Sequence, residues 1–467
     1  LEADRIVKEQ VEALAGQNAT DGALVAIQPK TGEILAMTGS ADFYNDAIAG
    51  QINMALQPRQ PGSSIKPLTY AAAFEKGWTP ATILWDVPSE FPPSGDPNDT
   101  REPYKPVNYD RRFHGPMSIR TALANSFNVP AVKALEFVGI YNNPATIEED
   151  GLIAFARRLG ISTLNQNDYG LSLTLGGGDV TLFDMTSAFS VFANNGLKVE
   201  PVAITRIEDH NGNVIYEAKP SEPKQVMRAE HAYLVTSILS DLVARAPMFG
   251  TDSILNLPFP AAAKTGTTND YRDNWTVGYT PDLSVGVWVG NADYTPMIDT
   301  SGVEGAAPIW NEFMNSAIPY LTSNTPSDFT RPDGVVEKEV CVYSGTEPSE
   351  ECPKTGTELF ASDQLPPSKD ESLWKHVKID TWTLLKASAA CNDFTEEKLV
   401  LNVTDKWAVK WIEETGDGDN WLEKMGFEDP VTFVPSRECR ADDSRPTLVF
   451  VGLNDNQTIT SETLHVY

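Results

Sequence analysis

The strand-like segments of this chain lie at two places far apart in the sequence, and helical segments separate them. Residues 23–37 read ALVAIQPKTGEILAM, in which two apolar β-rich runs flank a turn centred on Gly32. Three further strand-like runs, AAAKTGT, NWTVGYT and LSVGVWVG, lie between residues 261 and 291. The order strands, helices, strands predicts an α/β fold of the α+β type, in which helices flank a largely antiparallel sheet.

One predicted helix follows Pro61-Gly62 and reads SSIKPLTYAAAFEK, with Gly77 placed to cap its C-terminus. This assignment puts Ser63 at the N-terminus of the helix. By contrast, residues 79–116 are rich in Pro, Asp and Ser and predict a long connection that is functional or faces a substrate. Helical spacing also covers residues 117–137, 181–195 and 229–246.

The length of 467 residues exceeds what one hydrophobic core usually supports, so we expect more than one domain. The composition shifts towards Ser, Thr, Pro and Asp at residues 320–336, which indicates a boundary. We therefore predict an N-terminal helix or linker at residues 1–22, a large domain at 23–320 and an acidic C-terminal extension at 321–467.

All four cysteines lie in the predicted extension. An even number in one segment favours disulfides and hence an oxidising compartment, although reduced thiols in a cytosolic protein are the alternative. Of the three pairings that four cysteines allow, the most local joins Cys341 to Cys352 and Cys391 to Cys439. The extension also holds five tryptophans, which fit either the core of a small disulfide-braced module or a sugar-binding surface.

The net charge of −29 disfavours nucleic acid as a partner, because binding to phosphate backbones needs a basic surface. No apolar run reaches the ~20 residues that span a bilayer, and no signal peptide opens the chain. The sequence begins already in helical periodicity, so we expect that an upstream segment, such as an anchor, precedes it.

Acyl transfer through serine needs a nucleophile, a base within hydrogen-bond reach and donors aimed at the developing oxyanion. Ser63 and Lys66 can supply the nucleophile and the base, because residues at i and i+3 share one face of a helix. This S-x-x-K pattern also occurs at Ser221 and at Ser372. The former lies in a proline-broken loop and the latter in the cysteine segment, so we expect neither to be a nucleophile.

Two further short motifs accompany the first. S-x-N occurs once, at Ser126-Phe127-Asn128, while K-T-G occurs at Lys264-Thr265-Gly266 and again at Lys354. The first K-T-G is followed by Thr267 and lies in a strand-like run, whereas the second follows Cys352-Pro353 and predicts a cysteine-bounded turn. Only Ser63, Ser126 and Lys264 place the three motifs in order within one domain, which is the motif set of penicillin-binding proteins and β-lactamases.

Longer stretches around these motifs resemble the transpeptidase half of class A penicillin-binding proteins over about residues 20–320. The sequence departs from that pattern at Asn274 and Thr276, where Ala and Phe are expected, and we predict that this touches strand packing rather than chemistry. The stretches that carry the resemblance are RQPGSSIKPLTY (59–70), GPMSIRTALANSFNVPAV (115–132), LGGGDVTLFDMTSAFSVFANNG (175–196), KTGTTND (264–270) and GAAPIW (305–310).

The resemblance implies a D,D-transpeptidase that cross-links peptidoglycan stem peptides ending in D-Ala-D-Ala and that β-lactams acylate. Its site would comprise Ser63, Lys66, Ser126, Asn128 and Lys264 as catalytic residues, with Thr265, Gly266 and Thr267 binding the substrate and its oxyanion. Relatives of this kind usually carry a membrane anchor and an upstream glycosyltransferase domain, and work on the outer face of the bacterial cytoplasmic membrane. We expect neither a cofactor nor a metal, because the five histidines form no ligand-spaced cluster.

Other functions use the same motifs. A D,D-carboxypeptidase or a serine β-lactamase would hand the acyl group to water, and the motifs do not reveal how fast deacylation is. A non-catalytic β-lactam sensor would also be acylated, but it would not cross-link.

Overall fold

The computed structural model describes residues 1–145, 149–219, 221–427 and 430–444. Its main sheet has five strands in the order β2-β1-β11-β10-β9, and every neighbouring pair is antiparallel. The N-terminal hairpin therefore joins a sheet that residues 262–290 complete, which confirms the predicted antiparallel sheet. The strands are β1 (Asp21–Ile27), β2 (Ile34–Thr38), β9 (Ala262–Thr267), β10 (Asp273–Tyr279) and β11 (Ser284–Gly290).

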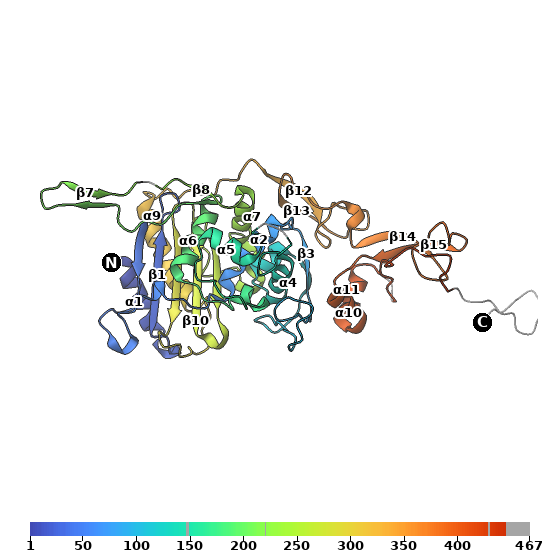
Figure 1. Ribbon diagram of the computed structural model, residues 1–467, viewed down its shortest axis with the longest axis horizontal. Helices are drawn as coiled ribbons and strands as arrows, with labels where there is room; N and C mark the ends of the chain where they lie inside the picture. Colours follow the sequence, from blue (N-terminus) through green and yellow to red (C-terminus); the bar gives the residue numbers. More distant parts are fainter. Residues whose placement is uncertain (146–148, 220, 428–429, 445–467) are drawn as a thin grey trace, which may run out of the picture. The chain divides into compact units, whose positions relative to one another are not determined.

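Helices cover both faces of this sheet, so β1, β10 and β11 are buried at every position. On one face, Leu24 and Ala26 pack in a cluster with α1 and α9, whereas Val25 on the other face packs with α2 and α6. Helices α2 and α6 lie on the side of the sheet away from α1 (Figure 1). The covering helices are α1 (Glu2–Ala13), α2 (Lys66–Glu75), α6 (Leu182–Ala193) and α9 (Ala306–Leu321).

The helical spacing at residues 117–137 belongs to two helices. Helix α3 ends at Ala124 and α4 begins at Asn128, because Ser126 adopts a left-handed conformation with φ of 62°. The segment at 229–246 likewise divides into two, since Asp241 caps a new helix. These helices are α3 (Ile119–Ala124), α4 (Asn128–Val138), α5 (Leu152–Leu159), α7 (Ala229–Leu239) and α8 (Leu242–Phe249).

The predicted long connection at residues 79–116 contains a small sheet. Strands β3 (Ile83–Asp86) and β4 (Gly115–Ser118) pair antiparallel and bring its two ends together. The loop between these strands therefore starts and finishes beside α3. Other short pairs are β5 (Leu197–Lys198) with β8 (Lys224–Gln225), and β6 (Arg206–Glu208) with β7 (Val214–Glu217).

The described residues form two compact units, of which the first contains residues 1–369 and 405–411. The predicted boundary at residue 321 stays a prediction, and it lies inside the first unit. Strands β12 (Val335–Cys341) and β13 (Thr355–Ala361) form a hairpin there, bridged by the Cys341–Cys352 disulfide. The predicted turn at the second K-T-G is wrong, because β13 begins at Thr355. The hairpin is tied to α3 by Glu358, which pairs with Arg120.

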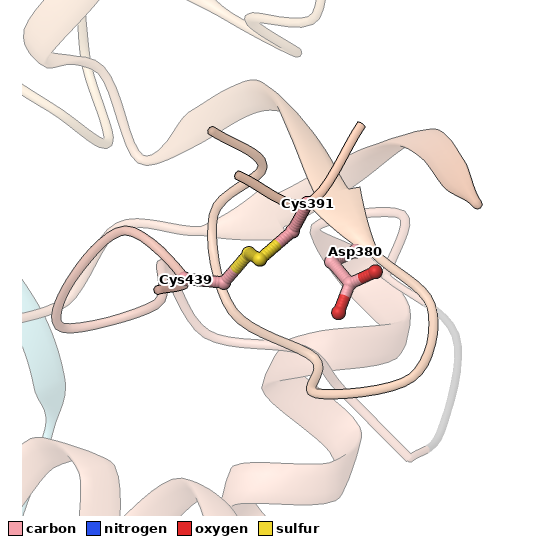
Figure 2. Close-up of side chains that lie close together, drawn as sticks. All are labelled: Asp380, Cys391 and Cys439. Atoms are coloured by element: carbon pink, nitrogen blue, oxygen red, sulfur yellow. A yellow bond between two sulfur atoms is a disulfide. The ribbon is translucent and has the colours of Figure 1, made fainter. Parts of the chain in front are cut away.

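The second unit contains residues 370–404 and 412 onwards, including the hairpin of β14 (Trp374–Asp380) and β15 (Thr395–Leu401). Helix α10 (Lys406–Glu414) spans the division, and α11 (Gly416–Lys424) follows it. A second disulfide joins Cys391 to Cys439, with Asp380 beside it (Figure 2). Among the described residues, no helix combines the length and apolar character that a membrane span needs.

Candidate active site

Strand β9, which carries the first K-T-G, is the edge strand of the main sheet, and a short 3-10 helix packs against it. This helix, η4 (Gly62–Ile65), contains Ser63 and leads directly into α2. Glycines on both segments permit the close approach: a Cβ added at Gly266 would lie 2.1 Å from the Pro61 carbonyl oxygen, and one added at Gly62 would lie 2.7 Å from the Thr267 backbone nitrogen. The two glycines thus fix Ser63 beside Thr267.

Ser63 lies in η4, the 3-10 turn that runs directly into the N-terminus of α2. The side chain is half-buried, and within the described residues its hydroxyl makes no hydrogen bond. It lines a groove of about 540 Å³, a volume typical of small-molecule sites. The groove is also lined by Val107, Asn108, Tyr109, Ser126, Asn128, Thr265, Thr267, Tyr271 and Glu304.

Lys66 is fully buried and points its ammonium group at the turn between α3 and α4. It donates to the backbone oxygens of Ser126 at 2.5 Å and of Phe127 at 3.1 Å, and to Asn128 Oδ1 at 2.7 Å. Its distance to Ser126 Oγ is 3.4 Å. The first and second predicted motifs are therefore in contact through this lysine.

Lys264 reaches the same serine from the other side. Its Nζ donates to Ser126 Oγ at 2.8 Å and to the Thr265 carbonyl oxygen at 2.8 Å. Ser126 therefore lies between two lysines, and its left-handed backbone places its hydroxyl there. Strain of this kind at a non-glycine residue is typical of sites where the surroundings impose a conformation.

Both lysines have lowered pKa values. Burial is the main cause for Lys66, whose pKa falls well below its usual range, and the positive charge of Lys264 acts in the same direction. The negative charge of Asp86 opposes this shift. Burial also lowers the pKa of Lys264 to about 7, with a further contribution from the charge of Arg245. The site can therefore hold a neutral amine near neutral pH, which a general base requires.

The rest of the first K-T-G segment faces the groove. Thr265 is nearly buried and Thr267 is half-buried, and both line the groove with Ser63. Thr267 Oγ1 accepts a hydrogen bond of 2.9 Å from the Gly302 backbone N–H. Because Gly266 has no side chain, the η4 segment can pack directly against it.

The two other S-x-x-K sequences have different surroundings. Ser221 precedes three exposed residues that include Lys224 of β8. Ser372 belongs to the second unit, is fully buried, and its Oγ accepts from the Trp374 backbone N–H at 3.4 Å. Neither serine lines the groove that contains Ser63.

Asn274 and Thr276, where the sequence departs from the class A pattern, are both fully buried on β10. Thr276 Oγ1 donates to the Gly302 carbonyl oxygen at 3.2 Å. Since the Gly302 N–H holds Thr267, this contact supports the K-T-G strand from behind. Asn274 packs against Gly305 just before α9.

Three residues near the groove were not predicted from the sequence as site residues: Asp86, His114 and Arg245. Asp86 is fully buried at the end of β3 and accepts from His114 Nδ1 at 2.7 Å. Arg245 is 3% exposed on α8 and shares a small cavity with Lys264. A lone Asp, His or Arg in a connection or on an amphipathic helix gives no sequence signal of this kind.

In the described part of the chain, one cluster of side chains has the spacing of metal ligands: Asp380, Cys391 and Cys439. Both sulfurs are joined in a disulfide (Figure 2), and the form of cysteine that binds metals is the thiolate. We therefore assign no metal to this cluster.

Comparison with known proteins agrees with this geometry. Residues 22–315 match the profile of the Penicillin binding protein transpeptidase domain, and residues 331–372 match that of the Penicillin-binding protein 1A, C-terminal domain. Penicillin-binding protein 1A of Neisseria lactamica is 32% identical over 331 residues, covering 69% of this chain and 39% of the relative. The Pseudomonas aeruginosa protein of that name is 29% identical, covering 76% of this chain and 46% of the relative.

Among solved structures, penicillin-binding protein 1A from Haemophilus influenzae matches with a TM-score of 0.63 and 26% identity, covering 74% of this chain and 54% of that one. A Mycobacterium tuberculosis penicillin-binding protein solved with penicillin V shares the fold, with a TM-score of 0.57. This chain spans about two fifths of the length of the Neisseria relatives. The transpeptidase profile covers more than half of the chain, and the chain belongs to the penicillin-binding protein transpeptidase family.

Proposed function

We propose that this chain is a D,D-transpeptidase that cross-links peptidoglycan stem peptides through an acyl-enzyme on Ser63. The observation that carries the proposal is that Lys66 and Lys264 both contact the hydroxyl of Ser126, which lines the same groove as Ser63. A serine, a buried lysine of lowered pKa and a relay hydroxyl supply what acyl transfer needs without histidine.

In the acylation step, neutral Lys66 takes the proton of Ser63 Oγ, which attacks the carbonyl carbon of the penultimate D-alanine. The backbone N–H groups of Ser63 and Thr267 stabilise the oxyanion, and loss of one such donor typically costs ~3 kcal/mol. The C–N bond then breaks. The proton held by Lys66 passes through the Ser126 hydroxyl to the departing amine of the terminal D-alanine.

In the second step, the amine of a neighbouring stem peptide attacks the Ser63 ester. A new amide bond forms as the ester C–O bond to Ser63 breaks, the proton given up by the amine returns to Ser63 Oγ, and the product is a cross-link. Lys264, Thr265 and Thr267 bind the carboxylate of the terminal D-alanine, while Asn128 holds Lys66 and the substrate amide. Protonated Lys264 is the natural partner for a carboxylate, and the threonine hydroxyls add hydrogen bonds.

A β-lactam presents the same bond in a ring, so its leaving group stays attached after Ser63 opens it. We expect a penicilloyl ester on Ser63 that persists for hours. From the class A resemblance we also propose that this activity lies outside the cytoplasmic membrane and that the whole protein carries an anchor and a glycosyltransferase domain. These features, like the substrate, are part of the proposal.

Intact mass measured after incubation with penicillin tests the nucleophile. We expect a mass increase of one drug molecule in the wild type and in Ser221→Ala, which removes the half-buried serine of another S-x-x-K sequence. Ser63→Ala should gain no mass. A one-drug increase that survives in Ser63→Ala would remove Ser63 from the mechanism.

A second measurement distinguishes the proposed activity from hydrolysis. The enzyme is given a donor stem peptide that ends in D-Ala-D-Ala together with an excess of an amine acceptor, and the products are separated by mass. A transpeptidase yields the amide-linked product. Release of D-alanine alone identifies a carboxypeptidase, and loss of the penicilloyl mass within minutes identifies a β-lactamase.

A further inference from the structure

Behind the turn that holds Lys66 lies a buried polar cluster that the proposed reaction steps do not use. Its centre is Asp86, which is fully buried at the end of β3. Asp86 accepts from Asn108 Nδ2 at 2.9 and 2.8 Å, one contact to each carboxylate oxygen, and from the His114 backbone N–H at 3.0 Å. His114 Nδ1 adds a contact of 2.7 Å. Every group around this carboxylate is a donor, which fits an ionised acceptor.

Asn108 connects this carboxylate to the catalytic turn. Its Nδ2 faces Asp86, so its Oδ1 faces the opposite way and accepts from the Asn128 backbone N–H at 2.7 Å. Asn128 Nδ2 in turn donates to the Val107 carbonyl oxygen at 2.7 Å. Asn128 is thus held by two contacts from the 107–108 segment, and its own Oδ1 receives Lys66.

A second route runs through His114. Its ring packs against that of Phe127 at a tilt of 31° with centroids 4.2 Å apart, and its Nε2 lies 3.0 Å from Asp110 Oδ2. The carbonyl oxygen of Phe127 accepts a hydrogen bond from Lys66 Nζ at 3.1 Å. Asp86 is therefore connected to two of the groups that orient Lys66: to Asn128 through Asn108, and to Phe127 through His114.

From this connectivity we infer that Asp86 is a positioning residue for acylation: through Asn108 and His114 it fixes the Phe127–Asn128 turn and thereby the direction of Lys66. The inference rests on the proposed function, since it assigns Asp86 to the orientation of the proposed base. Asp86 touches no reacting atom, and the groove wall formed by Asn108 separates it from the substrate space.

The charge of Asp86 also acts on Lys66. The titratable and charged groups within its influence are Lys66 and Tyr70 of α2, Lys133 of α4 and His114, while Lys66 also faces Lys264 of β9. Asp86 raises the pKa of Lys66, against burial and against Lys264, which lower it. Removal of the Asp86 charge therefore lowers the pKa of Lys66 further. Since the base acts in its neutral form, the acid limb of the rate profile moves to lower pH.

Two variants separate orientation from charge. Asp86→Asn keeps the shape but sets amide donors against the donors of Asn108 and His114. Asn108→Leu breaks the connection to Asn128 and leaves the charge of Asp86 in place. The measurement is the second-order rate of acylation by a fluorescent penicillin between pH 5 and 9, together with the melting temperature.

We expect both variants to acylate about 10- to 100-fold more slowly than wild type, as follows from losing a hydrogen bond to a charged group. Only Asp86→Asn should shift the acid limb downwards. Wild-type acylation rates in both variants, or an unshifted limb in Asp86→Asn, would overturn the inference. So would loss of the folded state in both, because the network would then hold the fold instead of the site.

The two proposals fail differently. If wild-type protein with an intact Ser63 forms no penicilloyl adduct, the proposed function fails. If the wild type is acylated and the two variants match it, the proposed function stands and the role of Asp86 is refuted.

Discussion

A buried ion pair connects the segment before Ser63 to the main sheet, and we predict that breaking it is costly. Arg59 Nε lies 2.7 Å from Asp273 Oδ1, and the side chains are 1% and 4% exposed. Arg59 Nη2 also donates to the Asn291 carbonyl oxygen at 2.9 Å, and the guanidinium lies 3.5 Å from the Tyr294 ring centroid. Trp288 Nε1 donates to the same Asp273 oxygen at 2.9 Å.

The perturbation is Arg59→Met, which keeps the volume of the side chain and leaves Asp273 buried without its cation. Removing one partner of a buried pair typically costs ~3–5 kcal/mol, because the remaining charge has no compensation. We expect a loss of this size in the free energy of unfolding, measured by urea titration with tryptophan fluorescence. Trp288 reports on the pair directly, because it contacts Asp273.

The double variant Arg59→Met/Asp273→Asn is the control, because it removes the stranded charge. It should be more stable than Arg59→Met by at least ~1 kcal/mol, if the uncompensated carboxylate is the source of the loss. The loss in the single variant should also be nearly the same at low and high salt, since buried pairs are little screened. A loss below ~1 kcal/mol, the range of exposed pairs, would refute the reasoning.

Three further predictions concern the surroundings of the site. Burial, with a further contribution from the charge of Arg245, lowers the pKa of Lys264 to about 7, and Arg245→Met removes that charge. In this variant the pKa of Lys264 should rise. The basic limb of the acylation rate profile, where Lys264 loses the proton that binds a carboxylate, should therefore move to higher pH. Arg245→Lys should leave this limb in place, and an unmoved limb in Arg245→Met would contradict the assignment. Gly62→Ala would place a Cβ within 2.7 Å of a β9 backbone nitrogen at a φ of 54°, so acylation should fall at least ~10-fold. The open Gly16→Ala should have no effect, and an equal effect of both would disprove the steric argument. Glu358→Gln weakens the ion pair between β13 and Arg120 of α3, so urea titration should show a loss of ~1–3 kcal/mol in the free energy of unfolding. Glu347→Gln, at an exposed position, is the control, and an equal loss there would contradict this role of Glu358.

The sequence predicted the main sheet and the three motifs of the candidate site, because both leave local signals. Short apolar, β-rich runs around Gly32 and after residue 261 predict strands whatever they pair with. The helical break at Ser126 was not placed by periodicity, since apolar spacing continues from α3 into α4 across it. The break depends on residues from elsewhere in the chain: two lysines hold the turn from opposite sides.

The second K-T-G shows the converse. Its local sequence, after Cys352-Pro353, predicts a turn, yet Thr355 pairs with Cys341 in the β12–β13 hairpin. Strand formation there depends on a partner segment and on the disulfide, which local propensity does not include.

By itself, the sequence determined the order and spacing of three motifs and the position of the apolar runs, since motif chemistry and periodicity are properties of neighbouring positions. Only the tertiary structure decided that Lys66 and Lys264 both contact the Ser126 hydroxyl, and that Asp86 lies behind the turn that contains Asn128. The physical reason is that burial and Coulomb interaction depend on distance in space. Segments more than a hundred residues apart, such as those of Ser126 and Lys264, come within 2.8 Å only when the chain has folded.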